Sequence, residues 1–498
     1  MAIINKLTAF GKNDIRGIYS EDITEELFYY VGRAFVRYVQ EKTNLERSDI
    51  WISIARDTRL HSPSLMNVVV KGLQHAGANV IELGMTPTPM AYYSEFIKIP
   101  YKDKEIKISA SMMVTASHNP KEYNGLKMTC RKSSLTENDI KRVKEITIEE
   151  LNSQTQFTSH GTKIEFDIVK HYLENTAKHF GQIGNGIKVV VDSANATAGI
   201  IAPQLFRETG CDVIELFSKP DGNFPNHHPN PSDEKTLDTI KKTVKETGAD
   251  VGIAFDGDSD RIGVIDNEGN YLTGDRLLYI YASDVVPDLV KRGEKPAVVS
   301  EVKCSQVLFD SINAIGGNAV MCKTGHGYIK SKMKETNAIL AGEMSGHMFF
   351  KDRYYGFDDA IYAGCRIIEI IAKNKLKNKD FKLSDLLEPF RKVYTTSEVR
   401  YKCENDLKDY IMEGLTKSIK NNEIDFAKPI KDIITIDGLR IVFDNGFALI
   451  RKSNTEPVFT LRFEADTKEC AENYKNTLIN VLDSYFTSDD IQNNKGQE

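Results

Sequence analysis

The chain has 498 residues, of which 41% are hydrophobic and 27% charged, and these are ordinary values for a globular protein. At about 100 to 200 residues per domain, this length predicts three or four domains and excludes a peptide or a single small module. The net charge is -6 and no long basic run is present, so the composition argues against nucleic acid as a partner.

The seven cysteines are scattered without a Cys-x-x-Cys pair, which indicates free thiols in a reducing compartment and no disulfide framework or zinc cluster. The N-terminal segment lacks the apolar run of a secretory signal. No stretch reaches the run of about 18 apolar residues that a membrane-spanning helix needs. We therefore predict a cytoplasmic protein without a membrane partner.

A strand-helix-strand pattern occurs three times along the chain. Each copy has a short apolar strand, a polar loop, a helical stretch, a glycine-containing stop and a second strand. The copies run over 51–83, 187–216 and 297–321. Such units favour parallel or mixed sheets covered by helices, with the loops at the strand C-termini facing a common cleft.

The segment after Glu388-Pro-Phe390 differs from these copies, because it is more charged and its strands alternate closely. Four strands are predicted over 432–437, 438–443, 446–450 and 458–463, followed by a helix over 468–485. The sequence therefore predicts an α/β protein with three related mixed-sheet domains and a smaller C-terminal α+β domain around a central cleft. The expected domain ranges are 1–159, 160–269, 270–388 and 389–498.

The segment Thr115-Ala-Ser-His-Asn-Pro120 follows an apolar run. Pro120 disfavours a helical Asn119, so the chain leaves the strand in an extended loop that can present the Ser117 hydroxyl at the sheet edge. Taken alone, the segment also fits an ordinary turn. Serine hydrolase chemistry is a poor fit, because the Gly-x-Ser-x-Gly elbow is missing.

Three carboxylates at alternate positions, Asp256, Asp258 and Asp260, lie between two apolar runs. In an extended loop they point to one side, as a hard divalent cation requires of oxygen ligands, and Mg²⁺ is the expected ion. A calcium EF-hand is excluded, because it requires Gly and Glu where this chain has Arg261 and Asn267. A solvated acidic turn is the alternative, although its three anions would repel one another.

The segment Gly342-Glu-Met-Ser-Gly-His347 follows a strand predicted over 338–341. Glu343 and Ser345 offer an acceptor and a donor two residues apart, which suits the vicinal hydroxyls of a sugar, and the glycines allow close approach. The nearby Lys323-Thr-Gly-His326 is similar in polarity. Each segment also fits a plain turn, and either histidine could be a surface residue.

The segment Arg451-Lys-Ser-Asn-Thr-Glu-Pro457 leads from a strand into a loop near the C-terminus. Arg451 can hold a phosphate through two contacts, and Ser453, Asn454 and Thr455 supply side-chain and backbone donors. An ordinary turn that binds no phosphate is the alternative. The chain has no Gly-x-x-x-x-Gly-Lys-Ser/Thr loop, and its Gly-x-x-Gly-x-Gly segment precedes a strand, which argues against nucleotide binding through either motif.

The order and spacing of these four segments, together with three α/β units, resemble the α-D-phosphohexomutase superfamily along nearly the whole chain. Within it, Gly342-Glu-Met-Ser-Gly-His347 and the downstream Phe349-Phe-Lys-Asp-Arg-Tyr-Tyr-Gly-Phe-Asp-Asp359 are similar to bacterial phosphomannomutase/phosphoglucomutase. The glucosamine branch usually carries Gln where Met344 stands. The resemblance implies four domains around a central cleft.

The resemblance also implies roles for individual residues. Ser117 would be the phosphoserine, and one oxygen of its phosphate would bind Mg²⁺ together with Asp256, Asp258 and Asp260. Proton transfer or contact with the reacting phosphate is implied for Lys127, His347, Arg16 and Arg261.

Substrate binding is implied for a further group of residues. Glu343 and Ser345 would bind sugar hydroxyls. The phosphate that does not react would be held by Arg451, Ser453, Asn454 and Thr455. Additional positions near the substrate would be Lys303, Arg276, Thr324, Gly325 and His326.

Two positions depart from the family pattern. Asn13 stands where Tyr often precedes Asp-Ile-Arg-Gly, so a Tyr hydroxyl is missing there. Ser259 stands where many relatives have Gly, and because the ligands are unchanged we expect only a local backbone adjustment.

The activity implied is reversible phosphoryl transfer between the 1- and 6-positions of mannose or glucose phosphate, through a phosphoserine enzyme. A hexose 1,6-bisphosphate would be both intermediate and activator, hexose phosphates would be the only partners, and the chain would be a monomer or weak homodimer. Phosphoglucosamine mutase is one alternative. A second alternative is a metal-dependent sugar-phosphate phosphohydrolase, which would release inorganic phosphate. A third is a non-catalytic sugar-phosphate sensor, which would not need Ser117.

Overall fold

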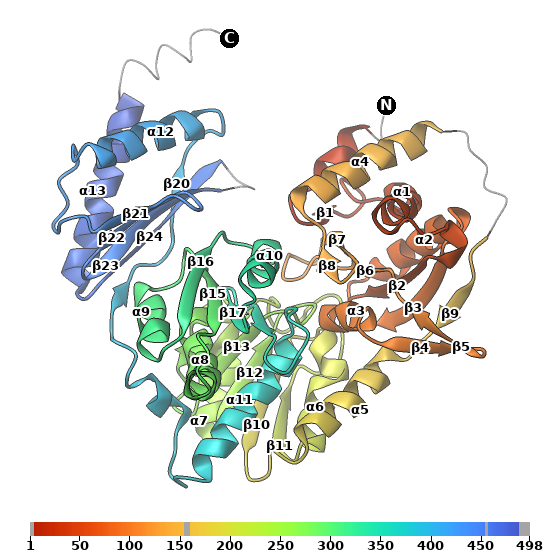
Figure 1. Ribbon diagram of the computed structural model, residues 1–498, viewed down its shortest axis with the longest axis horizontal. Helices are drawn as coiled ribbons and strands as arrows, with labels where there is room; N and C mark the ends of the chain where they lie inside the picture. Colours follow the sequence, from red (N-terminus) through yellow and green to blue (C-terminus); the bar gives the residue numbers. More distant parts are fainter. Residues whose placement is uncertain (1–3, 154–159, 454–456, 488–498) are drawn as a thin grey trace.

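The computed structural model describes residues 4–153, 160–453 and 457–487, and their strands form four larger sheets and one separate hairpin. In Figure 1 the four sheets with their helices follow one another in an arc, with the first domain and the last domain at its two ends. This arrangement confirms the predicted α/β class with a different C-terminal domain. Within the described ranges, no helix is both long and apolar enough to cross a membrane.

The first domain contains a seven-stranded mixed sheet with the order β1-β7-β6-β2-β3-β9, and β8 pairs with β7 at its end. Its strands are β1 (Ile15–Ile18), β2 (Trp51–Arg56), β3 (Asn79–Met85), β6 (Ala110–Val114), β7 (Tyr123–Cys130), β8 (Ser133–Ser134) and β9 (Lys163–Glu165). The separate hairpin consists of β4 (Lys98–Tyr101) and β5 (Lys104–Lys107). The helices are α1 (Glu25–Thr43), α2 (Ser62–His75), α3 (Thr88–Ser94) and α4 (Glu137–Asn152).

Local sequence signals explain these boundaries. Thr24 caps α1 by accepting a hydrogen bond from the Leu27 backbone, and Thr136 and Asp139 form a reciprocal capping box at α4. All residues of β6 are buried, because helices cover the sheet on both sides.

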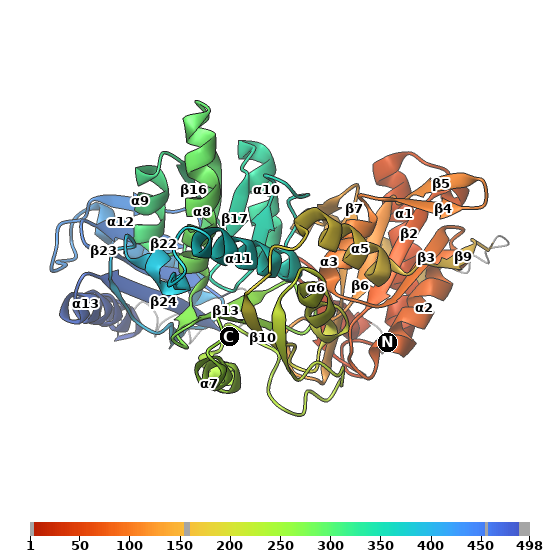
Figure 2. The ribbon, with the colours of Figure 1, turned by 90° about the horizontal axis from the view of Figure 1, so that it is seen from below.

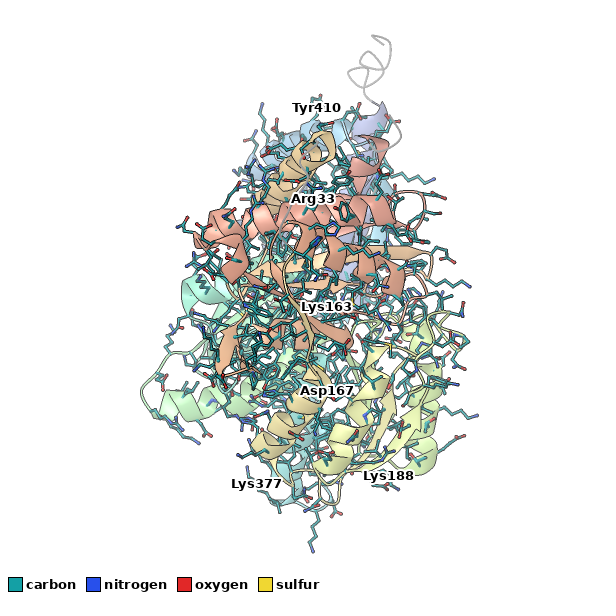
Figure 3. All side chains as sticks on the ribbon, turned by 90° about the vertical axis from the view of Figure 1, so that its right-hand side faces the viewer. Arg33, Lys163, Asp167, Lys188, Lys377 and Tyr410 are labelled. Atoms are coloured by element: carbon teal, nitrogen blue, oxygen red, sulfur yellow. The ribbon has the colours of Figure 1, made fainter. Side chains whose placement is uncertain are left out.

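Strand β9 lies after residue 159, where the sequence placed the start of the second domain. It nevertheless pairs in parallel with β3 and extends the first sheet. Figure 3 labels Lys163 on β9 and Asp167, which is the N-cap of the next helix, α5 (Ile168–Phe180). The chain therefore passes from the first sheet into the second domain through β9 and α5.

The second and third domains contain smaller mixed sheets, with the orders β11-β10-β12-β13-β14 and β16-β15-β17-β18. The remaining elements of the second domain are β10 (Lys188–Asp192), α6 (Ala202–Glu208), β11 (Asp212–Leu216), α7 (Asp238–Thr247), β12 (Val251–Phe255), β13 (Ile262–Asp266) and β14 (Tyr271–Leu272). Those of the third are α8 (Gly274–Lys291), β15 (Ala297–Glu301), α9 (Gln306–Ala314), β16 (Asn318–Cys322), α10 (His326–Thr336), β17 (Leu340–Gly342), β18 (Met348–Phe350) and α11 (Ala360–Lys375).

The repeat in the sequence corresponds to a repeat in topology. Each predicted unit forms a parallel strand pair joined by a helix, namely β2-α2-β3, β10-α6-β11 and β15-α9-β16. In each domain the first strand of the unit also pairs in parallel with a third strand, which turns into an antiparallel fourth strand. The three domains thus share one four-strand pattern.

The C-terminal domain contains an antiparallel six-stranded sheet and two helices. Its elements are β19 (Tyr394–Thr395), β20 (Val399–Lys402), α12 (Leu407–Lys420), β21 (Asp432–Ile434), β22 (Leu439–Phe443), β23 (Gly446–Lys452), β24 (Val458–Ala465) and α13 (Lys468–Thr487). The strand predicted over 432–437 is shorter in the structure, where it ends at Ile434.

The hydrophobic cores show how the domains are joined. One large core includes residues of the first three domains, and Figure 2 shows α11 in the middle of the molecule, between α8 and α5. The C-terminal domain has a core of its own and contacts the third domain through a small apolar cluster of Val302, Phe447 and Leu449. Buried Arg440 strengthens this contact by donating hydrogen bonds to the carbonyl oxygens of Val302 and Cys304.

Candidate active site

Three of the four predicted site segments occupy the same place in the shared fold. Each lies where the third strand of a domain turns into the fourth: 115–122 joins β6 to β7, 256–261 joins β12 to β13, and 343–347 joins β17 to β18. Each loop therefore leaves the carboxyl end of a parallel strand, where α/β proteins usually bind ligands.

Two glycines let these loops approach one another. A Cβ atom at Gly257 would lie 2.3 Å from the carbonyl oxygen of Ser117, and one at Gly346 would lie 2.3 Å from that of Ile262. Gly346 also has a φ of +91°, which favours glycine. Gly257 thus permits backbone contact between the first and second domains, and Gly346 permits it between the second and third.

Ser117 lies at the contact between the first and second loops. Its side chain is 1% exposed, and its hydroxyl donates a hydrogen bond of 2.7 Å to Oδ2 of Asp256. Its φ of +51° places a non-glycine residue in the left-handed region, which costs about 1 kcal/mol or more. Strain of this kind is concentrated at functional sites, because the surrounding structure must enforce it.

The carboxylates of Asp256, Asp258 and Asp260 lie close enough together to hold one cation. Lys127 on β7 binds two of them, with Nζ 2.6 Å from Oδ2 of Asp258 and 2.5 Å from Oδ2 of Asp260. The Oδ1 atoms of Asp258 and Asp260 are buried and have no hydrogen-bond partner within the described residues. Oxygen donors of this kind fit a hard divalent cation.

The electrostatics of this group follow from burial and charge. Burial, with the neighbouring Asp260 and Asp258, raises the pKa of Asp256 well above its ordinary value. Burial opposes the charge on Lys127, but Asp258 and Asp260 outweigh this effect and raise its pKa. Lys127 therefore keeps its proton at neutral pH while it is paired with these carboxylates.

Ser259, the position where many relatives have Gly, has a left-handed φ of +62°. This is a conformation that glycine adopts without strain. The Ser259 hydroxyl compensates by forming a buried 2.9 Å hydrogen bond with the Thr197 hydroxyl.

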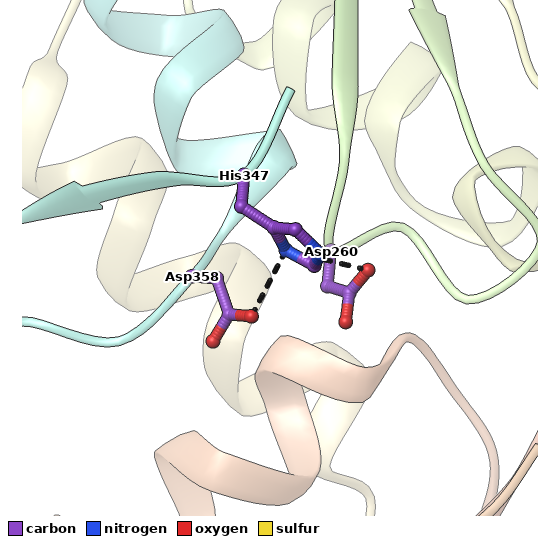
Figure 4. A group of neighbouring side chains, drawn as sticks. All are labelled: Asp260, His347 and Asp358. Atoms are coloured by element: carbon purple, nitrogen blue, oxygen red, sulfur yellow. Dashed lines mark ion pairs between the residues drawn. The ribbon is translucent and has the colours of Figure 1, made fainter. Parts of the chain in front are cut away.

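His347 links the metal loop to the third domain, and Figure 4 shows its ring between two carboxylates. Nδ1 lies 3.0 Å from Oδ2 of Asp358 and 3.8 Å from Oδ1 of Asp260. Arg261 donates from Nε to Nε2 of His347 at 3.0 Å, so Nε2 carries a lone pair in this arrangement. The ring of His326 stacks on that of His347 with centroids 5.6 Å apart.

Glu343 joins the two polar segments of the third domain. Its Oε1 accepts a hydrogen bond from the backbone N–H of Gly325 at 3.0 Å, and its Oε2 accepts one from the Ser345 hydroxyl at 3.1 Å. Burial and the nearby Glu301 raise the pKa of Glu343. Glu301 in turn forms an ion pair of 3.7 Å with Lys303.

The C-terminal domain contributes Arg451, which lies close to the third domain. Arg451 forms an ion pair of 2.7 Å with Asp437, and the same carboxylate accepts a 3.0 Å hydrogen bond from the Thr324 backbone. The Ser453 carbonyl accepts a 3.0 Å hydrogen bond from Lys408. The two other residues predicted for this segment, Asn454 and Thr455, lie outside the described residues.

The remaining predicted residues differ in how they are placed. Arg16 on β1 donates a 2.9 Å hydrogen bond to Oδ1 of Asn119, so it reaches the loop of Ser117. Arg276 lies in the first turn of α8, and its guanidinium has no hydrogen bond or ion pair with other described residues. The structure therefore connects Arg16 directly to this site but not Arg276.

Comparison with known proteins gives the family. Four models of phosphoglucomutase/phosphomannomutase domains match successive segments: alpha/beta/alpha domain I over 7–154, domain II over 170–269, domain III over 273–393, and the C-terminal domain over 398–481. A phosphomannomutase/phosphoglucomutase of Pseudomonas aeruginosa is 37% identical over 479 residues, which cover 96% of each chain.

The chain belongs to the phosphoglucomutase/phosphomannomutase family. It is therefore an enzyme, and the resemblance noted in its sequence is confirmed. A family member from Burkholderia thailandensis has a crystal structure with a TM-score of 0.85 and 34% identity, covering 97% of this chain and 98% of that one. An Aspergillus fumigatus N-acetylphosphoglucosamine mutase, in complex with GlcNAc-6P and magnesium, shares the fold with a TM-score of 0.60 at 15% identity, covering 97% and 99%.

Sequence reasoning missed two residues that hold the Ser117 loop of this family member, Asp57 and Arg59. Arg59 is 0% exposed, and its guanidinium donates to the Asp57 carboxylate and to the carbonyl oxygens of Ser117, Asn119, Pro120 and Tyr123. Asp57 also accepts a hydrogen bond from the Thr115 hydroxyl. Both follow the buried strand β2 directly, so their position at a strand end was the available signal.

Three further residues were also missed. Thr88, at the start of α3, donates a 2.6 Å hydrogen bond to Oδ2 of Asp258. Asp358 binds His347 as described and accepts a 2.9 Å hydrogen bond from Lys330. Asp358 lies in the segment 349–359 that carries the family resemblance, but no role was predicted for it, and no local pattern marks Lys330.

Proposed function

We propose that this enzyme is a phosphohexomutase that moves a phosphoryl group between the 1- and 6-positions of mannose or glucose phosphate. The observation that carries the proposal is the buried Ser117 hydroxyl, held in a strained loop 2.7 Å from the acidic triad. The names of the relatives support the same reaction.

In the proposed reaction Ser117 begins as a phosphoserine. A free hydroxyl of the hexose monophosphate attacks phosphorus in line, so a new O–P bond forms while the bond to Ser117 Oγ breaks. The hydroxyl proton passes to a base, and the product is a hexose 1,6-bisphosphate. This intermediate turns end for end, and Ser117 Oγ then loses its proton and attacks the other phosphate. A new bond from phosphorus to Ser117 Oγ forms while the bond to the sugar oxygen breaks, and that oxygen takes a proton. No phosphate is consumed, and added bisphosphate acts as an activator by restoring the phosphoserine.

We propose that Asp256, Asp258 and Asp260 hold one Mg²⁺ together with an oxygen of the Ser117 phosphate. The orphaned buried oxygens of Asp258 and Asp260 support this assignment. When bound, the ion supplies positive charge that stabilises the transferring phosphoryl group. The cations of this chain that flank the triad, Lys127 and Arg261, add to the same stabilisation.

Two residues are proposed to act in proton transfer, and their surroundings suggest different roles. Lys127 is charged beside two carboxylates, so it serves as a cation or a proton donor. The Nε2 lone pair of His347 accepts a hydrogen bond from Arg261, which would have to release it before Nε2 takes a proton, and Nδ1 faces Asp358, which holds the ring in one tautomer. We assign proton acceptance to His347.

Substrate recognition is proposed to involve the third and fourth domains. The carboxylate of Glu343 and the hydroxyl of Ser345 would bind sugar hydroxyls, as their placement side by side supports. Arg451 would hold the phosphate that does not react, with help from Ser453, Asn454 and Thr455. Further contacts are proposed from Lys303, Arg276, Thr324, Gly325 and His326.

The C-terminal domain contacts the third through a small apolar cluster and the hydrogen bonds of Arg440, and we propose that it shifts to admit and release the bisphosphate. We propose that the protein acts in the cytoplasm as a monomer or weak homodimer. The seven cysteines are free, and all but Cys470 are buried, which is consistent with a reducing compartment.

The decisive experiment compares mannose 1-phosphate, glucose 1-phosphate and glucosamine 1-phosphate in coupled assays with Mg²⁺ and a trace of glucose 1,6-bisphosphate. We expect the first two to be converted to 6-phosphates without release of inorganic phosphate. Conversion of the glucosamine compound alone would establish the phosphoglucosamine alternative. Stoichiometric phosphate release would instead establish a phosphohydrolase.

A second measurement tests the phosphoserine. Enzyme incubated with glucose 1,6-bisphosphate should gain one phosphoryl group, and peptide mapping should place it on Ser117. Ser133→Ala, a change at an exposed serine of β8, serves as the matched control for Ser117→Ala. A phosphoryl group on another residue would contradict the proposal.

A further inference from the structure

The first domain contains a cavity of about 930 Å³ that belongs to none of the site loops. It lies between the β4–β5 hairpin, at the outer side of the domain in Figure 1, and the amino end of β2, where Trp51 begins the strand. The catalytic loops leave the opposite end of the sheet, and the length of β2 separates the two by about 17 Å. The volume is in the range of small-molecule sites, which extends from about 300 to 1,000 Å³.

The floor of the cavity is apolar and aromatic. Trp51 and Tyr101 are both half-buried, with ring centroids 5.4 Å apart and planes at 60°. Ile106 and Ile108 are buried beside them and also line the cavity. Two partly open rings on an aliphatic base form a surface against which a planar ring can stack.

The rim carries an excess of positive charge. Its two carboxylates are Asp49 and Glu105, against five cations: Lys42, Lys104, Lys107, Arg131 and Lys132. Glu105 is neutralised by an ion pair of 2.7 Å with Lys98, and Lys42 by an ion pair of 2.7 Å with Asp139. Among the described residues, the ammonium groups of Lys104 and Lys107 have no ion pair or hydrogen bond, so both are available to an anion.

Two of these cations are held in place by strained backbone. Arg131 and Lys132 form the turn between β7 and β8 with φ values of +53° and +64°, where hairpins usually place Asn or Gly. The buried carboxyl group of Glu95 fixes this turn, because its Oε2 accepts a 2.6 Å hydrogen bond from the Lys132 backbone. The Arg131 guanidinium donates to the Lys42 carbonyl, and the Lys132 ammonium lies 4.7 Å from the centroid of the Phe96 ring, so both of these cations already have a partner.

We propose that this cavity is a second ligand site, separate from the catalytic site, and that it binds a nucleoside phosphate. The base would stack on one of the two rings, Trp51 or Tyr101, and meet the other with its edge, and the phosphates would contact Lys104 and Lys107. The ligand class follows from the aromatic floor and the lysines taken together. A free phosphate would not use the aromatic floor, and an uncharged ring would not use the lysines. Recognition of this kind needs neither of the glycine-rich nucleotide motifs that the sequence lacks.

The chain offers a direct test, because Trp51 is its only tryptophan. Fluorescence excited at the red edge of tryptophan absorption is followed while uridine diphosphate is added to the full-length enzyme. We expect a saturable change, with an affinity at least about tenfold higher than for uridine or for inorganic pyrophosphate. Saturating glucose 1,6-bisphosphate should leave the titration unchanged, because it would occupy the catalytic site.

Charge-matched variants complete the test. Lys104→Ala with Lys107→Ala should weaken uridine diphosphate binding at least about tenfold, while mutase activity without nucleotide stays unchanged. Lys170→Ala with Lys178→Ala, on exposed positions of α5, removes the same charge elsewhere and should bind normally.

Several outcomes would overturn the proposal. These are the lack of a saturable change at millimolar nucleotide, equal affinity for pyrophosphate, competition by the bisphosphate, or unchanged binding in the Lys104/Lys107 variant.

Discussion

Replacing Arg59 by lysine tests whether the Ser117 loop depends on one buried guanidinium. Arg59 donates to five acceptors: Asp57 Oδ2 at 3.0 Å and the carbonyl oxygens of Ser117 at 2.8 Å, Asn119 at 2.7 Å, Pro120 at 2.5 Å and Tyr123 at 3.1 Å. A lysine ammonium has three protons on one nitrogen, so at least two acceptors lose their donor. At about 1 to 3 kcal/mol for each unsatisfied buried group, we expect the free energy of unfolding to fall by about 2 to 6 kcal/mol.

The effect on catalysis should exceed the effect on folding. The loop residues that lose donors flank the Ser117 hydroxyl, and a displacement of about 1 Å at a reacting group can lower the rate about 10²-fold. We therefore expect kcat per folded molecule to fall about 10²-fold, with KM changed much less, because Arg59 contacts none of the described residues that are proposed to bind substrate. Phosphorylation of Ser117 by glucose 1,6-bisphosphate should slow in parallel.

The assay combines chemical unfolding, steady-state kinetics at a temperature where the variant is folded, and the rate of Ser117 phosphorylation. Arg56→Lys is the matched control, because Arg56 lies three residues away and, within the described ranges, its guanidinium donates only to the Asp57 carbonyl. We expect it to leave kcat unchanged. A folded Arg59→Lys enzyme with normal kcat and normal phosphorylation would refute the reasoning, as would an activity loss that the unfolded fraction fully explains.

Three other changes are predicted. Ser117→Ala should lower kcat by at least about three orders of magnitude, which corresponds to about 4 kcal/mol of activation free energy. Its circular dichroism spectrum should match that of the wild type. A smaller loss of kcat would count against the phosphoserine. A chelator should lower the melting temperature of the wild type, because it removes a metal ion that binds only the folded state. The melting temperature of Asp258→Asn should not respond to the chelator. Equal changes in the melting temperatures of the two proteins would argue against this metal site. Burial raises the pKa of Glu95 from 4.5 to about 7, so the folded protein keeps a proton there that the unfolded chain has lost. This contribution to stability is fully present below about pH 4.5 and is lost as the pH rises through about 7, by about 3 kcal/mol. Unfolding of the wild type and Glu95→Gln at pH 5 and pH 8 should therefore show the steeper loss in the wild type, and parallel losses would disprove the assignment.

Much of the fold could be predicted because its signals are local. The strand-helix-strand units appear in the sequence as apolar runs, a helical stretch and a glycine stop, and each one forms the expected parallel pair. The carboxylates of Asp256, Asp258 and Asp260 also lie close together as expected, but their loop is a tight turn with a left-handed Ser259 and not the extended segment that the sequence predicted. These features depend on residues within a few positions of one another.

The site itself depends on contacts that no local pattern contains. Ser117 and Asp256 are 139 positions apart, and Lys127 and Asp258 are 131 apart, yet each pair is hydrogen-bonded. Arg59, Asp358 and Asp437 gain their partners only where one domain or loop packs on another. The sequence alone determined which strands form, where their loops leave the sheet and which loops carry oxygen ligands. The packing of separate domains decided which of those loops meet, because a contact between distant residues depends on the relative placement of whole sheets and not on the periodicity of either segment.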